Sequence, residues 1–148
     1  MKLTQHFTLE EATVSSTAKQ RGLDNSPNST ELWELKFTAG CMEEVRRLLG
    51  NKPIKVNSWF RSAAVNAAVG GVSNSQHRKG QAVDFTCAQF GTPLEICRFL
   101  SKHKDALGYD QLILEPTWVH ISFVRSRPRR SDLTLAPGGK YLPGIVEL

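Results

Sequence analysis

The sequence predicts mixed helices and strands that fold as one domain, and three observations support this. Its 148 residues suit a single domain with a hydrophobic core of its own. Apolar residues recur at three- and four-residue steps over residues 31–49, which predicts a long helix. Two apolar runs at residues 111–115 and 118–123 predict strands, and the Pro116-Thr117 pair between them favours an antiparallel hairpin.

Shorter elements are expected around these. A threonine stands three residues before a glutamate at Thr8 and again at Thr92, which is the spacing of a capping box at a helix start. Strands are expected over residues 53–60 and 82–87, and a short helix should follow Arg61. The sequence has no internal repeat and no sign of a second domain.

The C-terminal segment differs from the rest in composition. Residues 125–148 are rich in arginine and contain two Pro-Gly pairs, which predicts a basic, loosely ordered tail that can hold one final strand. We therefore expect one domain over residues 1–148, with a core of about residues 7–124.

The composition, 40% hydrophobic and 22% charged, is ordinary for a soluble globular protein. No apolar run approaches the ~18 residues that a membrane-spanning helix needs. The N-terminal residues lack the pattern of a secretory signal, so we expect synthesis in the cytoplasm. The net charge of +5 favours an anionic partner, such as nucleic acid, teichoic acid or acidic peptide stems. The three cysteines lack Cys-x-x-Cys spacing and are expected to be free thiols.

The most informative stretch runs from Ser75 to Asp84 and joins a Ser-x-His motif to a Gly-x-Ala-x-Asp strand entry. A Trp-Val-His element follows later and ends at His120. His77, Asp84 and His120 offer two imidazoles and one carboxylate, a set that zinc accepts with its fourth position open, as in catalytic sites. The alternative is that each is an ordinary solvated or locally hydrogen-bonded residue, since such residues occur in most chains.

Five motifs stand in order along the chain: Trp59-Phe60-Arg61-Ser62 with Asn66, Val69-Gly70-Gly71, Ser75-x-His77, Gly80-x-Ala82-x-Asp84 and Trp118-Val119-His120. Together they resemble the M15 family of zinc peptidases. That family contains D-alanyl-D-alanine carboxypeptidases and phage L-alanyl-D-glutamate endopeptidases, and the hedgehog signalling domain shares its fold. The resemblance implies an α+β fold of this type, an antiparallel sheet with helices packed on one side.

The resemblance also implies roles for individual residues. The two histidines and the aspartate of the motifs would bind Zn²⁺. Arg61 would face the substrate and bind a peptide carbonyl or carboxylate. Ser75 would steady the first ligand or the substrate by hydrogen bonding. Trp118 flanks these residues and is a candidate substrate contact, although aromatic residues in strands belong to the core more often than not.

The general base is where the sequence departs from many relatives. Many members place an acid three residues before the last histidine ligand, and some place a histidine two before it, but Thr117 and Trp118 occupy these positions here. The nearest acid is Glu115, similar to the hedgehog arrangement, where a glutamate lies a little further back. We expect Glu115 to be the base. The alternative is that it ends a strand in solvent, with Asp110 and His103 as weaker candidates.

Two functions compete on these grounds. The first is a monomeric peptidase that hydrolyses peptidoglycan stem peptides, a phage or prophage lysis enzyme that reaches the cell wall by another route. The second is a zinc-stabilised cell-wall-binding module that kept the fold and lost its turnover. A nucleic-acid-binding protein is a distant third, because the arginine-rich tail lacks interleaved aromatic residues and any recognised binding motif. The sequence does not distinguish carboxypeptidase from endopeptidase activity.

Overall fold

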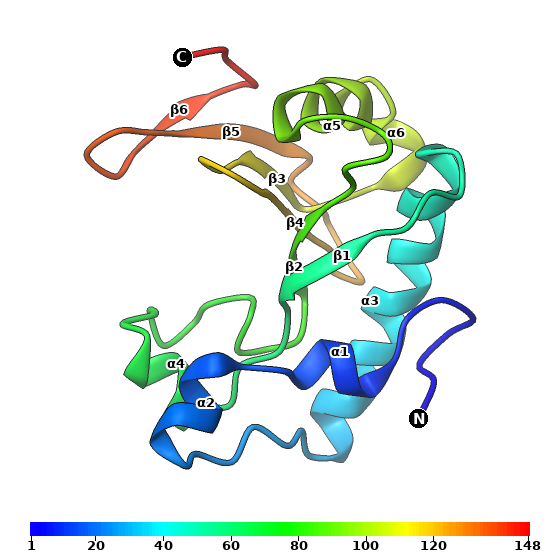
Figure 1. Cartoon of the computed structure of the whole chain (residues 1–148). Coiled ribbons are helices and arrows are strands. Elements are labelled where there is room, and N and C mark those ends of the chain that lie inside the picture. The colour runs from blue at the N-terminus through cyan, green and yellow to red at the C-terminus, as the bar shows by residue number, and fades with distance from the viewer.

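The structure is a computed structural model that describes all residues from 1 to 148, with helices around a six-stranded sheet (Figure 1). The helices are α1 (Leu9–Thr13), α2 (Ser16–Arg21), α3 (Ser29–Leu48), α4 (Ala63–Ala68), α5 (Pro93–Ser101) and α6 (Lys104–Leu107). The strands are β1 (Lys55–Ser58), β2 (Ala82–Thr86), β3 (Gln111–Leu114), β4 (Val119–Ser122), β5 (Ser131–Ala136) and β6 (Lys140–Pro143). None of the helices is long and apolar enough to cross a membrane.

The sheet is mainly antiparallel, with the strand order β1-β2-β4-β3-β5-β6. Every neighbouring pair is antiparallel except β3 and β5, which run parallel. Strands β3 and β4 form the hairpin that the Pro-Thr turn predicted, with Ile113 opposite His120. The combination of helices and a mainly antiparallel sheet confirms the predicted α+β class, and the likeness to the hedgehog fold stays a prediction.

One hydrophobic core joins the two longest helices to the sheet. Side chains of α3 and α5, such as Leu35 and Leu100, are fully buried together with Val83, Leu112 and Ile121 from the strands. Successive residues of a strand point to opposite faces of the sheet. The strand residues that alternate with these buried ones therefore point to the other face. The cysteines are free, as expected, and two of the three are buried.

The C-terminal segment is not the loosely ordered tail that its composition predicted. It contains two strands, and β5 lies inside the sheet, where it pairs with β3. The ordered sheet therefore continues well beyond residue 124. The prediction was wrong because arginines and Pro-Gly pairs surround a short period-two pattern at Leu133 and Leu135, and because local sequence does not reveal a parallel partner.

Asp132 anchors β5 to the neighbouring helices. Its carboxylate accepts hydrogen bonds from Ser101 Oγ (2.5 Å), Lys104 Nζ (2.8 Å) and Tyr109 Oη (2.5 Å). Burial by itself raises the pKa of Asp132, but these three donors outweigh it and hold the pKa below its usual range. The charged carboxylate is therefore the form that fixes β5 in place.

Replacing this carboxylate should destabilise the fold. Asp132→Ala should lower the free energy of unfolding by about 2 kcal/mol, because it leaves the buried hydroxyl of Tyr109 without its partner. Since folding lowers the pKa of Asp132, the loss of unfolding free energy relative to wild type should reach its full size above pH ~4. The loss should become smaller as the pH falls below this value. Urea unfolding at several pH values measures this difference.

Asp105→Ala is the matched control, because the Asp105 side chain is 92% exposed and should contribute little. Equal stability of the Asp132→Ala and Asp105→Ala variants would contradict the anchoring role.

Candidate active site

The register of the sheet brings two of the predicted ligands together. Asp84 on β2 and His120 on β4 lie directly opposite each other in an antiparallel pair. In such a pair, the two opposed side chains project from the same face of the sheet and lie next to each other. Their flanking residues Val83 and Ile121 point into the core. The apolar alternation of the two strands therefore decides that Asp84 and His120 share the polar face.

His77 reaches the same place from the loop before β2. Gly80 in this loop has a φ of +74°, which favours glycine, and a Cβ added there would lie 3.1 Å from Leu35. The carbonyl of Gly80 accepts hydrogen bonds from Thr38 Oγ1 (2.9 Å) and from Trp59 Nε1 (3.2 Å). The loop that carries His77 is thereby fixed against α3 and against the segment that follows β1.

The segment after β1 also holds His77 directly. The imidazole donates from Nδ1 to the carbonyl of Trp59 at 2.7 Å. The backbone N–H of Arg61 donates to the carbonyl of His77 at 3.0 Å. A carbonyl oxygen only accepts, so this contact fixes the tautomer and turns Nε2 toward the polar face of the sheet.

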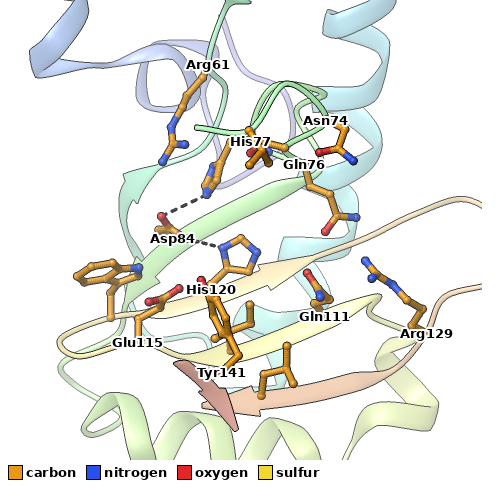
Figure 2. Close-up of a pocket in the computed structure, with 15 residues that line it drawn as sticks. Arg61, Asn74, Gln76, His77, Asp84, Gln111, Glu115, His120, Arg129 and Tyr141 are labelled. Atoms are coloured by element: carbon orange, nitrogen blue, oxygen red, sulfur yellow. Dashed lines mark hydrogen bonds and ion pairs between the residues drawn. The ribbon is translucent and has the colours of Figure 1, made fainter. Parts of the chain in front are cut away.

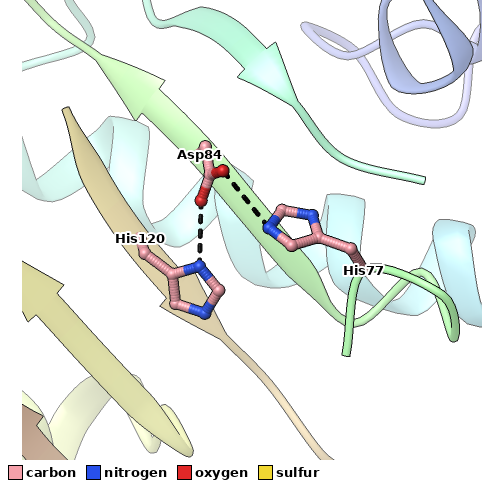
Figure 3. A group of neighbouring side chains, drawn as sticks. All are labelled: His77, Asp84 and His120. Atoms are coloured by element: carbon pink, nitrogen blue, oxygen red, sulfur yellow. Dashed lines mark hydrogen bonds and ion pairs between the residues drawn. The ribbon is translucent and has the colours of Figure 1, made fainter. Parts of the chain in front are cut away.

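The three side chains converge at one point, and we call them the His–Asp–His cluster (Figure 3). Asp84 Oδ2 lies 3.2 Å from His77 Nε2, and Asp84 Oδ1 lies 2.9 Å from His120 Nδ1. The candidate ligand atoms all lie within 4.8 Å of one another. The structure thus brings together all three residues that the sequence proposed as metal ligands.

The donor set of the cluster fits a divalent metal ion. When its Nδ1 donates to the carbonyl of Trp59 and no proton is on Nε2, His77 presents a lone pair on Nε2 to an oxygen of Asp84. Two acceptors that face each other at this distance need a cation between them, which is either a proton or a metal ion. Two imidazole nitrogens and one carboxylate oxygen form a set that zinc binds in sites with an open position.

Asp84 is held in its charged form. Burial by itself raises the pKa of Asp84, but the hydrogen bonds and charges of His120 and His77 outweigh it and hold the pKa well below its usual range. A deprotonated carboxylate is the form that binds a metal ion.

The cluster lies in a cleft of about 550 Å³ (Figure 2). Arg61 lines this cleft, and its guanidinium points toward Asp84. Arg129, on the other side, forms an ion pair with Asp110, whereas Arg61 pairs with no carboxylate. The donors of Arg61 are therefore available to a ligand in the cleft.

Two further predicted residues lie where they can contact the cluster or a ligand. Ser75 Oγ accepts a hydrogen bond from the backbone N–H of His77 at 3.2 Å, which steadies the loop around this imidazole. Trp118 lines the cleft, and its indole N–H is buried without a hydrogen-bond partner. A buried donor without a partner is costly unless a ligand accepts from it. Trp59, in contrast, packs against Phe7 in the core.

Glu115 is half-buried in the wall of the cleft and does not end its strand in solvent. Its backbone N–H donates to the carbonyl of Trp118 at 3.1 Å, which closes the turn and returns the chain toward His120. Figure 2 shows its side chain on the same side of the cleft as Asp84. Burial raises the pKa of Glu115 above its usual value, although His120 opposes this.

The two weaker candidates for the general base are engaged elsewhere. Asp110 is buried and accepts from Arg129 Nη2 at 2.6 Å and from Gln76 Nε2 at 2.9 Å. The hydrogen bonds from Arg129 lower the pKa of Asp110. His103 lies outside the cleft, where its Nδ1 is 2.9 Å from the carbonyl of Phe99.

Sequence reasoning missed a large part of the cleft wall. The missed lining residues include Asn74, Gln76, Gln111, Arg129, Leu133 and Tyr141. The predicted hairpin could have revealed Gln111, because it stands two residues before Ile113, which lies opposite His120. No local pattern could have revealed the last three, because they reach the cleft only through the pairing of β5 with β3.

Comparisons with known proteins cover the part of the chain that holds the motifs. A family model described as Peptidase M15 matches residues 5–122, a range that contains the His–Asp–His cluster, Arg61 and Glu115. A segment of 50 residues is 44% identical to the zinc D-Ala-D-Ala carboxypeptidase of Streptomyces albus G. That segment is 34% of this chain and 20% of the relative, so the chain matches about a fifth of the relative's length.

Metal binding by the cluster can be measured directly. The purified chain should hold about one zinc ion, and His77→Ala or His120→Ala should each remove most of it, because one of three ligands is lost. His103→Ala changes a histidine outside the cleft and should keep the metal. Elemental analysis after dialysis gives the zinc content, and circular dichroism reports the fold. Full zinc retention in both cluster variants would rule out this ligand set.

Proposed function

The chain belongs to the peptidase M15 family, and from this premise we propose that it is a zinc-dependent peptidase that hydrolyses peptidoglycan stem peptides. The observation that carries the proposal is the convergence of the His–Asp–His cluster in a cleft that also holds the unpaired Arg61 and the half-buried Glu115. The named function of the Streptomyces relative supports both the metal and the class of substrate.

Different residues of the cleft have different roles in the proposed hydrolysis. His77, Asp84 and His120 would hold the zinc ion, which when bound supplies a Lewis acid and lowers the pKa of water. Arg61 binds the substrate beside them, because its planar guanidinium can donate two parallel hydrogen bonds to a carboxylate. The same group can instead stabilise the negative charge that develops on the carbonyl oxygen. Trp118 supplies a further N–H donor.

Glu115 is the residue that moves the proton. Hydrolysis requires that the attacking water lose a proton and that the leaving nitrogen gain one. Asp84 is committed to the two imidazoles and Asp110 to Arg129, so Glu115 is the carboxylate left free in the cleft. It accepts the proton from water and returns it to the nitrogen. Burial raises the pKa of Glu115, which is the direction that suits a group that must both accept and return a proton.

The chemistry of the cleft bears on the position of the cleaved bond. If Arg61 binds a terminal carboxylate, the reaction is that of a carboxypeptidase. If it binds an internal carbonyl or side-chain carboxylate, the reaction is that of an endopeptidase. The net charge of +5 supports approach to an anionic cell wall. Action as a phage or prophage lysis enzyme stays a prediction from the sequence.

Digestion of purified peptidoglycan, followed by mass spectrometry of the products, tests the proposal and identifies the bond. The wild-type chain should shorten or release stem peptides, and Glu115→Gln should lose roughly a hundredfold or more in rate while it keeps zinc and stability. Glu44→Gln is the control, because Glu44 is a surface acid that pairs only with Arg47. This variant should cleave the wall at the wild-type rate.

Two outcomes would change the assignment. An intact wall after incubation with the zinc-loaded wild type would favour the binding-module alternative. Near-normal cleavage by Glu115→Gln would place the base elsewhere.

A conservative change at Arg61 tests its contact with the substrate. Arg61→Lys should lose about tenfold or more in kcat/KM with unchanged zinc content, because an ammonium cannot replace the planar fork. Arg98→Lys is the control, because Arg98 lies outside the cleft and pairs only with Glu147 at the surface. Steady-state kinetics on a stem peptide measure both variants, and wild-type turnover in Arg61→Lys would leave Arg61 with a structural role.

A further inference from the structure

The C-terminal segment brings a second guanidinium into the cleft. Arg129 lies beyond the residues that the family model matches, yet it lines the same cleft as the His–Asp–His cluster. Figure 2 shows Arg61 and Arg129 on opposite sides of this cluster. The proposed mechanism uses Arg61 and assigns nothing to Arg129.

Arg129 is held in a fixed orientation by a buried carboxylate. Its Nε lies 3.0 Å from Asp110 Oδ1, and its Nη2 lies 2.6 Å from Oδ2. The backbone N–H of Arg129 also donates to Oδ1 at 2.8 Å, and Gln76 Nε2 donates to Oδ2 at 2.9 Å. Asp110 therefore accepts hydrogen bonds from the guanidinium, from the backbone N–H of Arg129 and from Gln76. These bonds fix the orientation of the guanidinium.

The remaining edge of the guanidinium faces outward. The side chain of Arg129 is 58% exposed, whereas that of Asp110 is 4% exposed. Asp110 takes the edge formed by Nε and Nη2, and the N–H groups of Nη1 stay available. A planar donor that is already oriented matches a carboxylate better than a flexible one. Because Asp110 balances its charge, recognition by Arg129 depends on hydrogen-bond geometry.

The surroundings of Arg129 are suited to an anion. The polar groups beside it in the cleft are the neutral amides of Gln76 and Gln111 (Figure 2). The free carboxylate of the cleft, Glu115, lies on the other side of the His–Asp–His cluster. A negatively charged group next to Arg129 would therefore meet amide and guanidinium donors, while the neighbouring carboxylate of Asp110 is buried and already paired with Arg129.

We propose that Arg129 is a specificity residue that binds a carboxylate of the peptide substrate, across the His–Asp–His cluster from Arg61. This rests on the proposed peptidase function and narrows it. The preferred substrates are stem peptides in which an acidic group at this position is free, and peptides in which it is amidated are poorer substrates. A purely structural Arg129 would attach the segment before β5 to Asp110, which directly precedes β3, without this preference.

Synthetic stem peptides test the preference. One peptide keeps all its carboxylates, and in each of the others a single carboxylate is converted to an amide. The wild-type chain should cleave one of the amidated peptides about tenfold less efficiently than the acidic peptide, as expected for a lost hydrogen bond to a charged group. In the double variant Asp110→Asn/Arg129→Gln this ratio should fall to about one, because the acidic peptide loses its contact.

The double variant is used because Arg129→Gln alone would leave the buried Asp110 without its partner and could unfold the chain. Arg130→Gln is the matched control, since Arg130 is the next residue in the chain and pairs at the surface with Asp105. It should keep the wild-type ratio. Thermal unfolding and zinc content of each variant show whether the fold and the metal are retained.

The outcomes separate this inference from the proposed function. Efficient cleavage of every amidated peptide by the wild type, or an unchanged ratio in the double variant, would overturn the role of Arg129. If no peptide is cleaved, the proposed function fails, and the role of Arg129 is then decided by calorimetry. In that case the wild-type chain should bind the acidic peptide about tenfold more tightly than its amidated analogue, and equal affinities would refute the role.

Discussion

The carboxylate of Asp84, shared between two imidazoles, is the interaction on which the site depends. A charged group inside a protein is costly unless opposite charges and hydrogen bonds compensate for its lost hydration. Here the compensation comes from His77 and His120, which contact different oxygens of the same carboxylate. Removal of either histidine would leave one oxygen of the buried carboxylate without its hydrogen-bond partner. The same three groups can hold a metal ion, so the demands of folding and of metal binding coincide.

The other parts of the molecule bring these groups to one point. The pairing of β2 with β4 places Asp84 opposite His120. The loop that carries His77 is fixed by bonds to the carbonyl of Gly80 from α3 and from Trp59. Because the backbone N–H of Arg61 donates to the carbonyl of His77, the proposed substrate contact and the first candidate ligand are positioned together. A change that shifts this segment is expected to affect both metal binding and substrate binding.

The far wall of the cleft has a different origin. It is built by β5 and β6 and by the segment before them, most of which lies beyond the matched family residues. Buried carboxylates attach it to the rest of the fold, with Asp132 against α5 and α6 and Asp110 against Arg129. The candidate metal ligands, Arg61 and Glu115 thus lie within the residues that the family model matches, whereas Arg129, Leu133 and Tyr141 lie beyond them.

Local sequence determined most of the elements and nearly all of the candidate chemistry. Capping residues such as Thr92 and the period of apolar residues in α3 act within a few residues, so the sequence contains them directly. The motifs around His77 and His120 pointed to the candidate ligands, because metal binding requires particular residue types, and the structure brings these residues together. Glu115 followed from its place before the turn.

Only the tertiary structure decided how the C-terminal segment joins the site. Strand β5 pairs with β3 in parallel, and such pairing depends on contacts between residues far apart in the chain. Local composition carries no trace of those contacts, so the segment resembled a basic tail. The same long-range packing commits Asp110 to Arg129, leaves Arg61 unpaired, and turns Tyr141 and Leu133 into cleft residues. Residue types specify what the site can do, whereas the packing of distant strands specifies which groups remain free to do it.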